Sequence, residues 1–60
     1  MKIIAENIEK KTRLDAYLTT KLPEVSRSQI QKAIKADRVL VNGGSTSVPY
    51  FLHEGDSIEY

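Results

Sequence analysis

The apolar residues of this chain follow two spacings, a helical one in the first two thirds and a strand-like one towards the end. The clearest helical spacing is that of Ile30, Ala33 and Ile34, which stand at i, i+3 and i+4 and share one face of a helix. Ser26 and Gln29 have the spacing of a capping box, in which each side chain binds the other residue's backbone N–H. We therefore expect a helix that starts just after Ser26 and ends near Asp37, a residue that tolerates left-handed backbone.

Another helix is predicted earlier in the chain, so the helix that starts after Ser26 is the second of the two. Thr12 stands three residues ahead of Asp15, which repeats the capping-box spacing, so this helix should begin near Arg13. Pro23 pushes the residue before it out of the α region, so the helix should end near Lys21. The short connection that remains favours a helix–turn–helix pair with one shared core. The apolar positions of this helix are Leu14, Tyr17 and Leu18.

The segment after the second helix predicts a β-hairpin. Val39–Val41 is a β-branched run, and Asn42-Gly43 is a strong signal for a tight turn. The return strand would then be Ser45–Val48, ending before Pro49, which cannot donate a ladder hydrogen bond.

Both ends of the chain also have strand character. Lys2–Ala5 is short and β-branched, which suits an edge strand or a docked N-terminal arm. Glu54-Gly55-Asp56 reads as a turn, and Ser57–Tyr60 alternates like a last strand. The expected fold class is therefore α+β, with a two-helix helix-turn-helix-like pair packed on a small antiparallel sheet.

Residues 1–60 are expected to form a single domain with a small core, because so short a chain buries only about 60% of the surface that its unfolded form exposes. No Cys is present, so packing alone must hold the fold. No apolar run approaches the length of a membrane span or a signal-peptide core, and the cytoplasm is the expected location.

The charge of the chain is unevenly distributed, although its net value is only +1. All nine Lys and Arg lie within residues 1–38 against five acidic residues, which gives that part +4, while residues 39–60 carry three acids and no base. We expect one positive side, and the helices should form it. On the second helix, the residues outside the buried stripe are Arg27, Ser28, Gln31, Lys32 and Lys35.

This outer helix face has two interpretations. Cationic side chains and the free N–H groups of a first helical turn together suit the binding of phosphates. The same lysines also fit the ordinary solvated face of an amphipathic helix, and the helix alone leaves both interpretations open.

The sequence gives little indication of a catalytic or metal-binding site. His53 lies near Glu54 and Asp56, but a His beside an acidic turn is normally a surface residue, and no Cys or second His completes a metal or nucleophilic site. We predict no catalytic residue, metal or cofactor. Gly43-Gly44 is too short for a phosphate-binding loop, although a tip without side chains would let another backbone approach closely. The aromatic residues favour core positions over base stacking; they are Tyr17, Tyr50, Phe51 and Tyr60.

Four segments, in order and spacing, resemble the S4 domain, the RNA-binding module named after ribosomal small-subunit protein four. They span about three quarters of the chain and are Arg13-Leu14-Asp15, Ser26-Arg27-Ser28-Gln29, Arg38-Val39-Leu40-Val41-Asn42-Gly43 and Glu54-Gly55-Asp56-Ser57-Ile58. The junction Leu22–Ser28, and Pro49-Tyr50 ahead of the Gly55-Asp56 turn, most resemble the N-terminal S4 domain of large-subunit ribosomal RNA pseudouridine synthases. Two positions depart from the family pattern: Asp37 stands where Gly is frequent, and Gly44 where Lys or Arg is common.

The resemblance implies RNA binding by the second helix and the hairpin after it. The residues that it indicates are Arg27, Ser28, Gln31, Lys32 and Lys35, with Arg13, Arg38 and Gly43 nearby. We therefore expect a non-catalytic module that binds structured, ribosomal RNA and targets a downstream pseudouridine synthase domain, which 60 residues are too few to contain. On this interpretation the chain is an N-terminal fragment, and it is monomeric. The alternatives are a free-standing ribosome-associated or heat-shock-type RNA-binding protein, and a protein-interaction domain.

Overall fold

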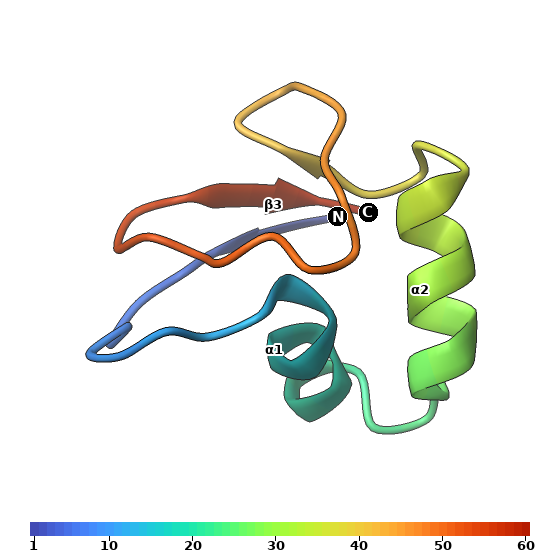
Figure 1. Cartoon of the computed structure of the whole chain (residues 1–60), viewed down its shortest axis with the longest axis horizontal. Helices are drawn as coiled ribbons and strands as arrows, with labels where there is room; N and C mark the ends of the chain where they lie inside the picture. The colour runs from blue at the N-terminus through green and yellow to red at the C-terminus, as the bar shows by residue number, and fades with distance from the viewer.

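The computed structural model describes residues 1–60 and has two helices beside a three-stranded sheet (Figure 1). Both sheet pairings are antiparallel, and the two helices contact each other. The predicted α+β architecture, a helix pair with a small antiparallel sheet, is confirmed. In chain order the elements are β1 (Lys2–Ile4), α1 (Leu14–Lys21), α2 (Arg27–Lys35), β2 (Leu40–Val41) and β3 (Ser57–Glu59).

The last strand of the chain lies in the middle of the sheet, whose order is β1-β3-β2 (Figure 1). Ile58 of β3 pairs with Ile3 on one side and with Val41 on the other, and its side chain is fully buried. The predicted edge strand at the N-terminus and the predicted last strand are both confirmed. The two chain ends lie side by side, because the Met1 amino group donates to the Tyr60 carbonyl oxygen at 2.7 Å.

The predicted return strand Ser45–Val48 is wrong. The Asn42-Gly43 turn forms as expected, with backbone hydrogen bonds between Val41 and Gly44 in both directions, but pairing ends there. β3 takes the place of the return strand, since Asn42 N donates to the Ser57 carbonyl oxygen at 2.7 Å. Ser45–Ser47 are polar and offer no apolar side chain to bury, so nothing in them favours a strand over this longer-range partner.

Helix α2 starts and ends as its sequence predicts. Ser26 Oγ accepts a hydrogen bond from Gln29 N, and Gln29 Oε1 accepts one from Ser26 N, both at 3.2 Å, so the capping box is confirmed. At the other end Asp37 has a φ of 58°, the left-handed conformation. Asp37 N donates to the Ile34 carbonyl oxygen and Arg38 N to that of Ala33, which is the Schellman pattern of helix termination.

The predicted cap of α1 is wrong. Arg13 is the N-cap residue and makes no side-chain capping bond, while Thr12 Oγ1 donates to the Lys10 carbonyl oxygen. Asp15 cannot complete a box with Thr12, because its carboxylate is fully buried and turned towards α2. The predicted end of the helix at Lys21 is confirmed.

The core lies between the helix pair and the sheet. The two isoleucines of the α2 stripe, Ile30 and Ile34, are buried, and Ala33 is half-buried beside them. Three of the four aromatic side chains, those of Tyr17, Tyr50 and Tyr60, pack against the core, but Phe51 is exposed. The buried apolar residues are Ala5, Leu14, Leu18, Ile30, Ile34, Val39, Val41, Leu52 and Ile58.

Candidate nucleic-acid interface

One side of α2 is polar and cationic from end to end. Successive helical residues are rotated by about 100°, so the five predicted contact residues of this helix span an arc of roughly 140° that adjoins the buried isoleucines. Four of them are exposed, and Gln31 is half-buried at the junction with α1. In order around the arc they are Arg27, Gln31, Lys35, Ser28 and Lys32.

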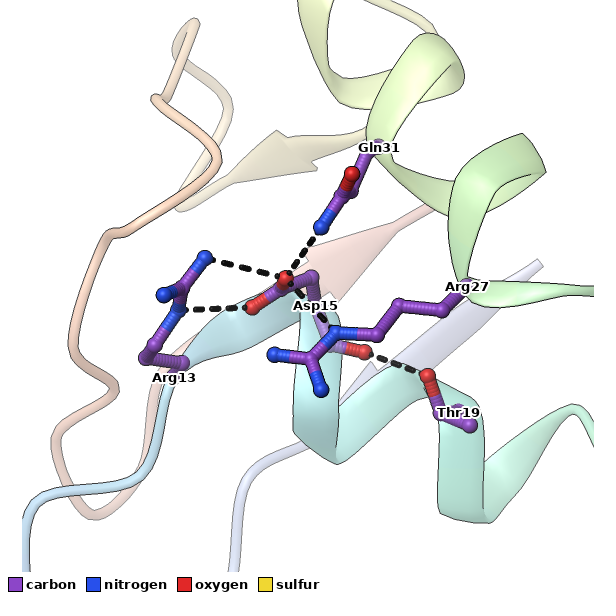
Figure 2. A network of polar contacts seen from close by, with 5 residues as sticks. All are labelled: Arg13, Asp15, Thr19, Arg27 and Gln31. Atoms are coloured by element: carbon purple, nitrogen blue, oxygen red, sulfur yellow. Dashed lines mark hydrogen bonds and ion pairs between the residues drawn. The ribbon is translucent and has the colours of Figure 1, made fainter.

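The buried carboxylate of Asp15 joins this arc to the start of α1 (Figure 2). Its Oδ2 accepts from Gln31 Nε2 at 2.9 Å and from Arg27 Nε at 3.1 Å. Arg13 donates from Nε to Oδ1 and from Nη2 to Oδ2, each at 3.1 Å. Three of the predicted RNA-binding residues, Arg13, Arg27 and Gln31, are therefore held together by one carboxylate.

The hydrogen bonds to Asp15 keep it ionised although it is buried. Burial alone would raise the pKa of this carboxyl, but the hydrogen bonds from Gln31, Arg13 and Arg27 outweigh burial and lower the pKa from 3.8 to about 2. A buried charge with several well-formed donors is stable only while all of them stay in place. Asp15 therefore fixes the positions of the two arginines at neutral pH.

Both arginines keep donors free for a ligand. A guanidinium carries five N–H groups in a planar fork. Arg27 uses only Nε on Asp15, and Arg13 uses Nε and Nη2, so each retains unbonded N–H groups. Their side chains are 51% and 40% exposed, respectively. The two guanidinium groups and the one carboxylate together carry a net charge of +1, and their positions are fixed before any ligand binds.

Lys32, Lys35 and Arg38 make no ion pair, since the three ion pairs of the chain involve Asp15 and Asp56 only. All three are exposed. Lys35 lies on the same arc as Arg27, whereas Arg38 follows the end of the helix and lines a shallow groove on its opposite flank with Gln29 and Ala33. Lys32 stands at the end of the arc and also lines this groove. The structure thus places Lys35 on the arc between the two ends marked by Arg27 and Lys32, and it places Arg38 with Lys32 at the groove on the other flank of α2.

Gly43 occupies the tip of the turn after β2, where Asn42 and Gly43 have φ values of 53° and 80°. A Cβ built on Gly43 would meet no atom within 4 Å, so the tip is open, but its backbone conformation favours Gly. Strand β2 runs away from the end of α2, which separates this turn from the cationic arc (Figure 1).

A second buried carboxylate, Asp56, holds the base of that turn. Asp56 Oδ1 accepts from Asn42 Nδ2 at 3.0 Å, and Oδ2 accepts from Tyr50 Oη and His53 N, both at 2.9 Å. Burial raises the pKa of Asp56, but the bonds from His53, Asn42 and Tyr50 outweigh it and leave the pKa below its ordinary value. The hydrogen bond to Asp56 raises the pKa of Tyr50, helped by burial.

His53 lies at the surface, with its side chain 77% exposed. Its Nδ1 is 3.4 Å from the Tyr50 hydroxyl oxygen and 3.8 Å from Asp56 Oδ2, and the Tyr50 hydroxyl itself donates to Asp56. No group of three or more His, Asp or Glu side chains is arranged to hold a metal ion. Neither helix has the length and apolarity that would be needed to cross a lipid bilayer.

The central role of Asp15 escaped the sequence reasoning, which assigned it to a helix cap. A usable signal was present: Asp15 lies two positions after Arg13 and near the start of a helix that must pack on Arg27 and Gln31. An acidic residue on the packed side of one helix and cations at the start of its partner indicate a buried ion pair.

Comparison with known proteins identifies the family of this chain. The model of the family described as "S4 domain" matches residues 12–58. A protein of Bacillus subtilis (strain 168) named "Uncharacterized RNA pseudouridine synthase YlyB" is 32% identical over 56 residues, which are 93% of this chain and 18% of that protein. This chain therefore spans less than a fifth of the length of that curated relative. No solved structure matches the chain.

S4 domains bind RNA and are themselves non-catalytic. Both motifs at the helix starts, Arg13 to Asp15 and Ser26 to Gln29, lie within the matched segment and build the carboxylate-centred cluster described above. Since the match extends over well more than half of the residues and includes both helices, the chain belongs to the S4 domain family.

Proposed function

We propose that this S4 domain binds structured, ribosomal RNA through the outer face of α2 and targets a pseudouridine synthase domain to its substrate. The observation that carries the proposal is the arrangement around Asp15, which fixes Arg27 and Gln31 on the same arc of α2 that carries the unpaired Lys35 and Lys32. Such an array meets several phosphates at once with little loss of side-chain freedom, because the Arg27 and Gln31 side chains are already fixed.

The composition of this face favours recognition of RNA shape over base sequence. An A-form helix hides its base edges in a deep major groove, while its phosphates are accessible. Cationic side chains outnumber amides on the arc, and phosphate contacts position a protein without reading bases. A stem beside a loop is therefore the expected ligand, and Arg13 extends the contact towards α1.

The targeting role is supported by the name of the B. subtilis relative, an RNA pseudouridine synthase. The S4 domain supplies no catalytic group, so uridine isomerisation belongs to a separate domain on this proposal. Binding by shape and phosphate would bring that domain to a folded RNA, and the choice of uridine would belong to the enzyme domain itself.

A salt-resolved titration of an RNA stem–loop tests the binding face. If about three or four phosphates are neutralised, log K should fall against log salt with a slope of roughly −2 to −4. Replacement of Lys32 and Lys35 together by Ala should flatten that slope by about 1.5–2 and weaken different RNA sequences alike. The matched control is the Lys2→Ala and Lys21→Ala double variant, which removes the same charge from exposed sites outside α2 and should leave the slope near that of the wild type.

An unchanged slope in the Lys32→Ala, Lys35→Ala variant would reject α2 as the binding face. A wild type that binds without salt dependence would reject electrostatic RNA binding and favour a protein-interaction domain. Mapping of pseudouridines in ribosomal RNA from cells that carry the same double substitution tests the targeting role. Loss of modification at particular uridines is expected, and an unaltered map would support a free-standing RNA-binding protein.

A further inference from the structure

We infer that Phe51 is a stacking platform for an unpaired base at the edge of the RNA held by α2. This inference rests on the proposed RNA binding and adds a contact that the cationic arc does not supply. Phe51 is the only Phe of the chain and is 43% exposed, whereas the three tyrosines pack against the core. Its neighbour Leu52 is buried, so the backbone at this point directs Phe51 outward.

The position of Phe51 is fixed by backbone pairing with the start of α1. Arg13 and Phe51 form an antiparallel bridge, flanked by hydrogen bonds from Leu14 N to the Tyr50 carbonyl oxygen at 2.8 Å and from Leu52 N to that of Thr12 at 2.9 Å. Residues directly opposite each other in antiparallel pairs have side chains on the same face, with Cβ atoms about 5 Å apart. Phe51 therefore stands beside Arg13 on one rigid surface.

Arg13 connects this aromatic side chain to the RNA-binding face. Its guanidinium donates to Asp15, which also receives Arg27 and Gln31 (Figure 2). Through the bridge to Arg13 and the shared Asp15 carboxylate, Phe51 is thus linked to Arg27 in the first turn of α2. An RNA strand whose phosphates lie on Arg13 and Arg27 would carry its next base towards Phe51.

The surroundings of Phe51 suit an unpaired nucleotide. Lys11 Nζ lies over the face of the ring in a cation–π contact, 5.5 Å from its centroid, and makes no ion pair. A base that stacks on this face would displace the Lys11 side chain, whose ammonium is then free to bind the phosphate of the stacked nucleotide. Two acidic residues, Glu9 and Glu54, line the groove beside the ring, and the Glu54 carboxylate already accepts hydrogen bonds from Asn7 N and Ile8 N. An aromatic face with flanking cations is the usual platform for single-stranded nucleotides, because every base has a π-face.

The single Phe allows a direct test without mutation. Protein labelled with 4-fluorophenylalanine should show one ¹⁹F resonance, and a stem–loop with an unpaired purine next to the stem should shift it. The same stem–loop with an abasic residue at that position should bind with the same salt slope and shift the resonance much less. An equal response to both RNAs would overturn the inference.

Two variants distinguish the effect of base stacking from the effects of side-chain size and charge. Phe51→Leu keeps an apolar side chain and should weaken binding of the unpaired-purine RNA by about 5- to 150-fold, the range of one lost base stack. Phe51→Tyr keeps the aromatic face and should bind like the wild type. Because neither substitution changes charge, the salt slope should be unaltered in both, and thermal unfolding of each variant checks the fold.

The outcomes distinguish this inference from the proposed function. If Phe51→Leu binds the purine stem–loop as tightly as the wild type and with the same salt slope, Phe51 is not a stacking platform. RNA binding by α2 would still stand. Absence of salt-dependent RNA binding by the wild type would overturn both. Self-association that disappears in Phe51→Leu, measured by sedimentation without RNA, would instead identify the exposed ring as a contact between copies of the chain and would also overturn the inference.

Discussion

Gln31 Nε2 on α2 donates to Asp15 Oδ2 on α1 at 2.9 Å, and this bond between two buried or half-buried side chains sets how the helices face each other. It is the shortest of the four hydrogen bonds that the carboxylate accepts, and its donor is neutral, so it adds no charge to the face. Helix packing and the display of cations on α2 therefore depend on the same atoms.

Asp15→Asn should lower the free energy of unfolding by about 2 kcal/mol at pH 7. The pKa of Asp15 is about 2 in the folded protein against 3.8 when it is unperturbed, and each pKa unit corresponds to about 1.4 kcal/mol. The lowered folded-state pKa means that this contribution is complete above pH 4, decreases as the pH falls from about 4 to about 2, and is absent below. Urea unfolding of both proteins at pH 7 and at pH 2 measures it.

The difference between wild type and Asp15→Asn should therefore nearly vanish at pH 2. The variant should still lose some stability in acid, because the pKa of Asp56 is also lowered in the folded state. A difference that is constant with pH would show that the carboxylate charge contributes nothing and that only side-chain shape matters at this position.

Ile34→Ala should destabilise the domain by about 2–5 kcal/mol, because Ile34 is fully buried in a core of only nine apolar residues. A loss of this size approaches the whole stability of a small domain, so the variant could be largely unfolded at 25 °C. The neighbouring Lys35→Ala, at an exposed position, is the control and should change stability by at most about 0.5 kcal/mol. Circular dichroism during urea unfolding measures both, and equal effects would contradict the packing of α2.

Ser26→Ala should cost about 0.5–2 kcal/mol through loss of the hydrogen bond from Gln29 N to Ser26 Oγ. Ser28→Ala, two residues further along the chain and without a capping bond, is the matched control and should cost less. The amide ¹H and ¹⁵N shifts of Gln29 report the bond directly. Unmoved shifts at Gln29 in Ser26→Ala would mean that the capping box does not form in solution.

Asp37→Gly should stabilise the domain by about 0.5–1 kcal/mol. Asp37 has a φ of 58°, which costs an L-residue energy and Gly almost none, and its negative charge lies at the negative end of the helix dipole. Asp37→Asn separates the two causes, because it removes the charge and keeps a side chain that tolerates left-handed backbone. Thermal unfolding of the three proteins gives the order Gly, Asn, Asp if both causes act, whereas a less stable Asp37→Gly would refute the strain argument.

The sequence predicted those parts of the fold that depend on neighbouring residues. The Ser26 and Gln29 capping box, the isoleucine stripe and the Asn42-Gly43 turn all formed, since each needs only a few residues with the right spacing. The predicted cap at Thr12 and the return strand after Gly44 failed because distant partners replaced local ones. The Asp15 carboxylate accepts hydrogen bonds from Arg27 and Gln31, and the Asn42 side chain accepts one from Ser57 N.

In the candidate site, too, the features that depend on neighbouring residues could be predicted and those that depend on distant partners could not. Helical periodicity alone placed Arg27, Gln31 and Lys35 on one face, and the structure agrees with that placement. No periodicity could show that Arg13 joins them through a shared carboxylate, or that Arg38 turns to the other flank of α2. Those relationships arise from how α1 packs on α2 and from the left-handed turn at Asp37.

The central place of β3 in the sheet has a consequence for the order of folding. Pairing of Lys2 with Glu59 closes a loop of nearly the whole chain, whereas Asp15 reaches its donors across at most sixteen residues. The entropy of loop closure grows with loop length, and contacts between residues far apart in sequence slow folding. The helix pair with its cationic cluster can therefore assemble before the sheet, and the rate at which the domain completes its core is set by the meeting of its two ends.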